Sequence, residues 1–128
     1  QHDLFARWPD LPIYLVGYSG GIVLALSGIQ EHPRVCGVSG LGADGIPEDV
    51  EIPFDGNGRP RWQLELHYCA GDRVRSFNRS MIQELVDADV ARVFIAGSGG
   101  HDFQSYLNTR AVRETIQSAQ TAFAAADP

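Results

Sequence analysis

The stretch GYSGG at residues 17–21 places one serine, Ser19, between small residues in the pattern Gly-x-Ser-x-Gly. A serine hydroxyl is a weak nucleophile until a neighbouring base takes its proton, and that base needs an acid that orients it. Ser19 is therefore a candidate nucleophile for acyl transfer. The sequence must also supply a histidine and a carboxylate that reach Ser19 in the fold.

Ser19 lies between two apolar runs, one typical of a strand (residues 13–16) and one typical of a helix packed inside the molecule (residues 20–29). This strand–turn–helix setting is what a nucleophile elbow requires. The turn is so tight that the residues two positions before and after the serine must be small, here Gly17 and Gly21. We expect the Gly20 amide, at the positive end of the helix, to donate to an oxyanion. A phosphate-binding turn is the alternative, but the turn at residues 17–21 carries neither GxGxxG nor GK[ST].

Four histidines compete for the role of base. His2 lies near the start of the sequence, His32 in a turn, and His67 inside a predicted strand. His101 lies in a loop between the fourth predicted strand and the last predicted helix. Because loops at the carboxyl ends of parallel strands carry the active site in open α/β sheets, we predict that His101 is the base.

The acid is expected at the same edge of the sheet. Asp72 is the first polar residue after the third predicted strand, which favours it as the acid. Asp44, after the second strand, is the alternative. Asp102 adjoins His101, but neighbouring residues seldom present their side chains to each other. The predicted triad follows the chain order serine, aspartate, histidine, which differs from the order in the two common serine-protease types.

The elements that must position these residues alternate along the chain. Short apolar runs predict strands at residues 13–16, 35–39, 64–68 and 92–96, and amphipathic patterns predict further helices around residues 81–86 and 112–123. This alternation predicts an α/β fold with a parallel sheet of about four strands and flanking helices. We expect residues 1–128 to form a single, partial domain, in which residues 44–61 form a loop and no large lid domain is present.

With its elbow, Asp72 and His101, nearly the whole chain resembles the C-terminal half of an α/β-hydrolase. Within that superfamily it resembles the esterase-D-like group in residues 32–40 (HPRVCGVSG), in Asn78 and Arg79 after the acid, and in residues 100–103 (GHDF). It differs at the elbow, where those esterases have GxSMGG and this chain has Gly20. The resemblance implies a serine hydrolase that cleaves an ester or thioester through an acyl-enzyme on Ser19, without metal or organic cofactor.

The resemblance also implies that the half of the fold before the elbow is absent from this sequence. An apolar strand at a sheet edge is a liability unless something pairs with it. We therefore expect a second chain or segment to complete the sheet and to supply the second oxyanion donor. Two other functions stay open: an acyltransferase or thioesterase of a biosynthetic pathway, and a non-catalytic binding subunit with this fold.

The sequence indicates the residues that bind the substrate less clearly than it indicates the triad. Tyr18, Phe54 and Trp62 are candidates to line an acyl pocket, although packing explains Phe54 and Trp62 equally well. Cys36 and Cys69 lie inside apolar runs without a zinc-type spacing, so we expect buried free thiols.

Charge and hydropathy exclude some partners. The net charge of −6 argues against nucleic acid and anionic membranes, since both require a basic surface. No apolar run reaches the roughly 18 residues of a membrane span. Because the first residues do not resemble a signal peptide, we favour a cytoplasmic location and otherwise leave localisation open.

Overall fold

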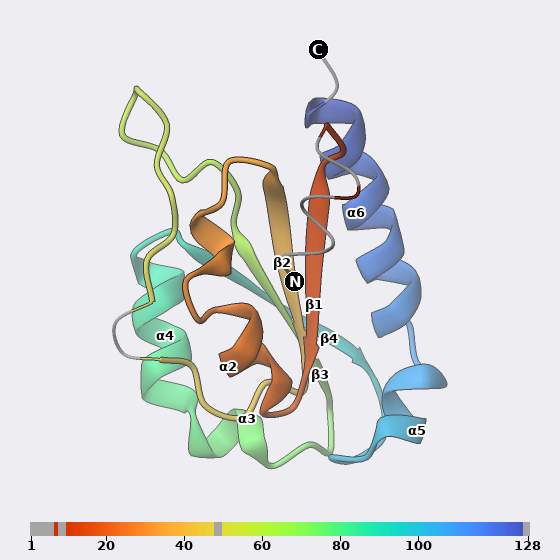
Figure 1. Cartoon of the computed structure of the whole chain (residues 1–128). Helices are drawn as coiled ribbons and strands as arrows, with labels where there is room; N and C mark the ends of the chain where they lie inside the picture. Colours follow the sequence, from red (N-terminus) through yellow and green to blue (C-terminus); the bar gives the residue numbers. More distant parts are fainter. Residues whose placement is uncertain (1–6, 8–9, 48–49, 127–128) are drawn as a thin grey trace.

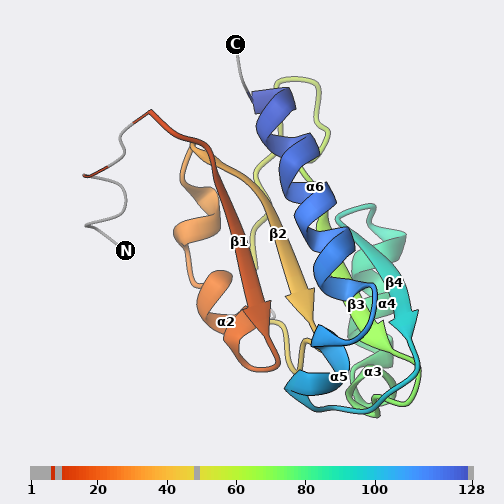
Figure 2. The same ribbon diagram turned by 90° about the vertical axis from the view of Figure 1, so that its right-hand side faces the viewer.

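Four parallel strands form one sheet in the order β1-β2-β3-β4. The computed structural model describes residues 7, 10–47 and 50–126. Its strands are β1 (Ile13–Tyr18), β2 (Val35–Leu41), β3 (Leu64–Cys69) and β4 (Ala91–Gly97). Each predicted strand is confirmed and ends one or two residues later than expected. Because all four strands run in the same direction, their carboxyl ends lie at one edge of the sheet. In Figure 2 the four arrowheads point toward this edge, where α5 also lies.

Helices cover both faces of the sheet. The helices are α2 (Gly21–Ala25), α3 (Val74–Phe77), α4 (Arg79–Asp87), α5 (Phe103–Leu107) and α6 (Ala111–Ala126), and a 3-10 turn, η1, spans Ile29–Glu31. The helices α2 and α4 lie on one side of the sheet and α6 lies on the other (Figure 1). None of the helices in the described residues is long and apolar enough to span a bilayer.

The main apolar core lies between the sheet and the α2–α4 layer. Every residue of β3 is buried, and its side chains alternate between the two faces of the sheet. On the α2–α4 side the core contains Ile22, Val38, Leu64, Leu66, Tyr68 and Ile82. This core fixes the strand ends from which the candidate site residues project.

The helix after Ser19 is shorter than the sequence predicts. We expected a helix over residues 20–29, but α2 ends at Ala25 with Leu26 as its C-cap, and Gly28, in a left-handed conformation (φ 106°), begins η1. The expectation that this helix is packed on nearly all sides is also wrong for the described structure, since the Leu24 side chain is 69% exposed.

The connection between β2 and β3 includes residues 44–61, the segment that we expect to form a loop. Its described residues contain no helix, and Phe54 and Pro60 form an isolated antiparallel bridge. Ile46 and Ile52 join the apolar core and hold the loop against the α4 side.

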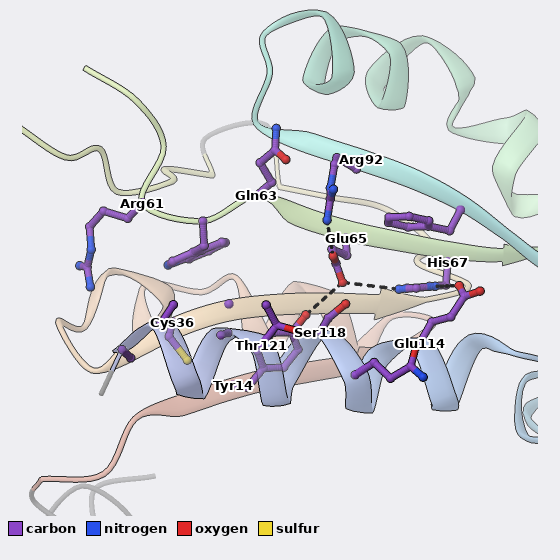
Figure 3. Close-up of a pocket in the computed structure, with 17 residues that line it drawn as sticks. Tyr14, Cys36, Arg61, Gln63, Glu65, His67, Arg92, Glu114, Ser118 and Thr121 are labelled. Carbon is purple, nitrogen blue, oxygen red and sulfur yellow. Dashed lines mark hydrogen bonds and ion pairs between the residues drawn. The ribbon is translucent and has the colours of Figure 1, made fainter. Parts of the chain in front are cut away.

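The face of the sheet under α6 is polar. Glu65 accepts hydrogen bonds from Arg92 at 2.7 Å and from Tyr14 at 3.3 Å, and His67 lies between Glu65 (3.8 Å) and Glu114 of α6 (3.6 Å) (Figure 3). These residues line a cavity of about 650 Å³ between α6 and the sheet. Both cysteines are free, as predicted, although Cys36 beside this cavity is only partly buried.

Glu65 makes the polar layer sensitive to pH. Burial alone would raise the pKa of Glu65, but contacts with His67, Ser118 and the Arg92 guanidinium outweigh burial and lower it to about 2. The ionised carboxylate therefore stabilises the fold above its unfolded-state pKa of about 4.3, and this contribution falls as the pH drops toward 2.

We predict that Glu65→Gln lowers the free energy of unfolding at pH 7, because a neutral amide pairs poorly with the Arg92 guanidinium. Urea unfolding of both proteins at pH 7 and pH 3.5 measures the effect. The difference between parent and variant should be smaller at pH 3.5. An equal difference at both pH values would contradict this role of the Glu65 charge.

Candidate active site

The structure brings Ser19, His101 and Asp72 into one hydrogen-bonded chain. Ser19 Oγ lies 2.8 Å from His101 Nε2, and His101 Nδ1 lies 2.8 Å from Asp72 Oδ2. An ionised carboxylate can only accept, so the geometry fits a ring that carries its proton on Nδ1 and accepts from the serine hydroxyl at Nε2. The His101 side chain is 31% exposed, whereas that of Asp72 has no exposed surface.

The turn that holds Ser19 is strained. Ser19 has φ 51°, in the left-handed region, which costs a residue with a side chain roughly 1–2 kcal/mol. Its amide donates to Leu41 O at 2.9 Å, and its carbonyl accepts from the Asp44 amide at 3.3 Å. The turn is thus tied to the end of β2, and strain of this kind is concentrated at functional sites.

The two glycines that flank Ser19 differ in their steric surroundings. A Cβ at Gly17 would lie 2.6 Å from backbone atoms of Ile22, so only glycine fits there. A Cβ at Gly21 would meet no atom of the described residues within 4 Å, which contradicts the prediction that this position must be small. Gly20 forms the N-cap of α2 beside Ser19, and its role as an oxyanion donor stays a prediction.

A close backbone contact brings Asp72 and His101 together. The loops after β3 and β4 touch at Gly71 and Gly99, where the Gly71 amide donates to Gly99 O at 2.8 Å. A Cβ on Gly71 would lie 2.6 Å from that oxygen. Gly99 has φ 128°, which a larger residue would rarely adopt. These two glycines set the distance between the acid and the base.

Three donors surround the Asp72 carboxylate. Oδ1 accepts from the Val74 amide at 3.0 Å, while Oδ2 accepts from both His101 and the Tyr106 hydroxyl, the latter at 2.5 Å. Tyr106 was not predicted as a site residue, because no sequence motif marks it. The available signal was indirect: a buried carboxylate needs donors, and Tyr106 is the first tyrosine after His101.

The other candidate acids have different partners. Asp44 is exposed and accepts from Asn78 at 3.3 Å. Asp102 is the N-cap of α5, where it accepts from the Ser105 amide (2.7 Å) and hydroxyl (2.8 Å), and these bonds lower its pKa. The structure therefore brings Asp72, and not Asp44 or Asp102, into hydrogen-bond contact with the His101 ring.

The other histidines lie elsewhere. His67 is buried in the polar layer under α6 (Figure 3), and His32 accepts from the Arg34 amide at 3.2 Å in the turn before β2. His2 lies outside the described residues.

Of the predicted pocket residues, the structure brings Tyr18 alone to the site. The Tyr18 ring stacks on His101 (centroids 5.9 Å apart) and packs edge-on against Phe103 (5.1 Å), a neighbour the sequence analysis did not single out. Trp62 precedes β3 while Asp72 follows it, and a six-residue strand spans roughly 20 Å. Trp62 and Phe54 line two other cavities, neither of which includes a triad residue.

Comparisons with known proteins bear on the fold. No protein-family model and no curated protein matches the chain. A solved structure described as a ferulic acid esterase is similar to it, with a TM-score of 0.59 and 18% sequence identity. The match covers 84% of this chain and 51% of that chain, so this chain spans about half the length of its structural neighbour. At this identity the likeness shows a shared α/β fold, which is consistent with part of an α/β-hydrolase-like fold, and nothing finer.

The two flanking glycines offer a matched test of the turn. We predict that Gly17→Ala lowers the free energy of unfolding by about 1–3 kcal/mol, because its Cβ overlaps the Ile22 backbone. Gly21→Ala has open space and a helical position, so its stability should stay within about 1 kcal/mol of the parent or rise. Urea denaturation measures both. Equal losses for the two variants would refute the steric account of Gly17.

Proposed function

We propose that this chain carries the nucleophile, base and acid of a serine hydrolase that cleaves a carboxylic ester or thioester. The hydrogen-bonded chain from Ser19 through His101 to Asp72 is the observation that carries the proposal. The strained backbone at Ser19 supports it, and so does the description of the structural neighbour as an esterase. The finer likeness to the esterase-D-like group rests on residues 32–40 and 100–103 and stays a proposal.

In the proposed reaction, Ser19 Oγ attacks the acyl carbon while His101 Nε2 takes the hydroxyl proton. Asp72 keeps the Nδ1 proton in place and stabilises the imidazolium. The Gly20 amide donates to the oxyanion of the tetrahedral intermediate. His101 then gives its proton to the leaving alcohol or thiol, which departs and leaves an acyl-serine. Water, deprotonated by His101, hydrolyses the acyl-enzyme and restores the Ser19 hydroxyl.

We also propose that a further chain or segment pairs with β1. In the described residues β1 is an edge of the sheet, and its Val16 side chain is 52% exposed. An unpaired apolar edge strand invites pairing. The match covers 51% of the neighbouring esterase structure, so that protein contains further chain outside the matched part, which is compatible with an additional segment. The same segment would supply the second oxyanion donor.

Fluorophosphonate labelling tests the nucleophile. We predict that the native protein gains one phosphonyl group on Ser19, located by peptide mass spectrometry, because His101 makes this hydroxyl the activated one. Ser19→Ala should abolish labelling. His101→Ala should slow it at least about 10³-fold, as expected when a triad loses its base.

Ser27→Ala is the matched control, since its exposed hydroxyl binds only to the Leu24 carbonyl in the described structure and has no base beside it. Its labelling should equal that of the parent. A native protein that is folded but takes no label would overturn the hydrolase proposal and favour the non-catalytic subunit. Rapid acyl-enzyme formation that is discharged only by an added alcohol or amine would instead indicate an acyltransferase.

The proposed pairing of β1 is tested on the enzyme purified from its source. Native mass spectrometry should show a mass larger than the 14.0 kDa of this chain, because an additional polypeptide segment covers the β1 edge. Denaturing mass spectrometry then separates a second chain from a covalent extension. A native, active species that contains this chain alone would refute the proposal.

A further inference from the structure

Tyr106 is a buried residue whose hydroxyl group contacts Asp72. The proposed reaction at Ser19 does not by itself require this hydroxyl. Its side chain has no exposed surface, and it lies in α5, one turn after the loop that carries His101. The Tyr106 hydroxyl accepts a hydrogen bond from the Cys69 amide at 3.0 Å, at the end of β3. It donates to Asp72 Oδ2 at 2.5 Å.

The direction of the proton in this short hydrogen bond follows from its neighbours. The Cys69 amide is itself a donor, so it occupies an acceptor position on the phenolic oxygen. An ionised carboxylate has no proton to give. Burial raises the pKa of Tyr106, and so does the hydrogen bond to Asp72, so the phenol stays protonated. Its one proton therefore points at Asp72 Oδ2.

That oxygen is the one that also accepts from His101 Nδ1, at 2.8 Å. Two donors on one oxygen share its negative charge, so each additional donor weakens the attraction that the carboxylate exerts on a protonated imidazole. A tyrosine donor in this place thus limits the tendency of His101 to become charged. A base that must accept the Ser19 proton has to be neutral before the reaction begins.

We propose that Tyr106 is a positioning residue that acts through Asp72: it fixes Oδ2 beside Nδ1 of the His101 ring and weakens the attraction of the carboxylate for a protonated imidazole. This proposal rests on the proposed function of Ser19 as nucleophile. The ring of Tyr106 is held in place by close packing, since a Cβ on Gly42 would lie 2.9 Å from it. The Tyr18 ring packs on it at 5.9 Å, so the donor cannot easily turn away.

Other titratable groups face this site from the packed elements. Burial raises the pKa of Tyr18 at the end of β1 and of Tyr68 and Cys69 of β3, so these groups stay neutral near pH 7. Asp102 lies beside His101 with a lowered pKa because Ser105 donates to it, so it stays ionised. None of these four groups changes charge near pH 7, and all of them are retained in Tyr106→Phe.

Tyr106→Phe tests the proposal because it keeps the ring and removes the donor. We expect the acidic limb of the pH profile for fluorophosphonate labelling of Ser19 to move to higher pH by roughly half to one unit. Tyr68→Phe is the matched control: it removes a buried tyrosine hydroxyl on β3 that donates to Ala43 O and not to Asp72. Its acidic limb should coincide with that of the parent.

A second measurement covers the outcome in which Tyr106→Phe does not fold, since it leaves the Cys69 amide without its acceptor. Incorporation of 3-fluorotyrosine at position 106 keeps the hydroxyl and makes it a stronger donor, which should move the acidic limb to lower pH. An unmoved limb in both proteins, or a limb that moves the opposite way, would overturn the proposal.

Proton NMR separates this proposal from the proposed function. Titration of the His101 ring, assigned by comparison with His101→Asn, needs no catalysis and should shift in Tyr106→Phe by the same amount as the labelling profile. A protein that takes no label but shows this shift would refute the nucleophile and retain the Tyr106 effect. A labelled protein whose His101 titration is unchanged in the variant would refute the role of Tyr106 alone.

Discussion

The buried charge of Asp72 is the constraint on which the rest of the site depends. A carboxylate without exposed surface is costly unless donors meet its oxygens. Here the donors come from three separate places: the Val74 amide at the start of α3, the Tyr106 hydroxyl of α5 and the His101 ring from the loop after β4. Each of these segments must be in its native place before the charge is satisfied. The acid thus links the local geometry of the site to the packing of the whole carboxyl edge.

The two faces of the sheet differ in polarity and contribute differently to the site. The apolar core on the α2–α4 side fixes the strand ends, which allows the turn at Ser19 to hold a strained conformation. The opposite face is polar near Glu65 and becomes apolar again toward the carboxyl edge, where Cys69, Ala96 and Tyr106 pack together. This second, smaller cluster surrounds the hydroxyl that contacts Asp72. The site therefore borders a buried apolar cluster on one side, while Ser19 and His101 reach the surface.

The sequence predicted those features that depend on local pattern. Short apolar runs revealed all four strands, and the position of Asp72 and His101 just past strand ends was enough to predict that they meet, since parallel strands end at one edge. Features set by contacts between distant segments were not predictable. The hydroxyl of Tyr106 reaches Asp72 through the packing of α5, and the open space around Gly21 depends on which segments pack against the first residue of α2. Sequence spacing carries no information about either.

The strand order has a consequence for how the protein folds. Every strand pair joins strands that are neighbours along the chain, so the sheet can grow step by step. The contact between Ser19 and His101 instead joins residues 82 positions apart, across a sheet whose first and last strands lie roughly 14 Å apart. Closing so long a loop has a large entropic cost until the intervening strands are in register. We therefore expect the hydrogen bond between Ser19 and His101 to form late in folding, after the strands between them have paired.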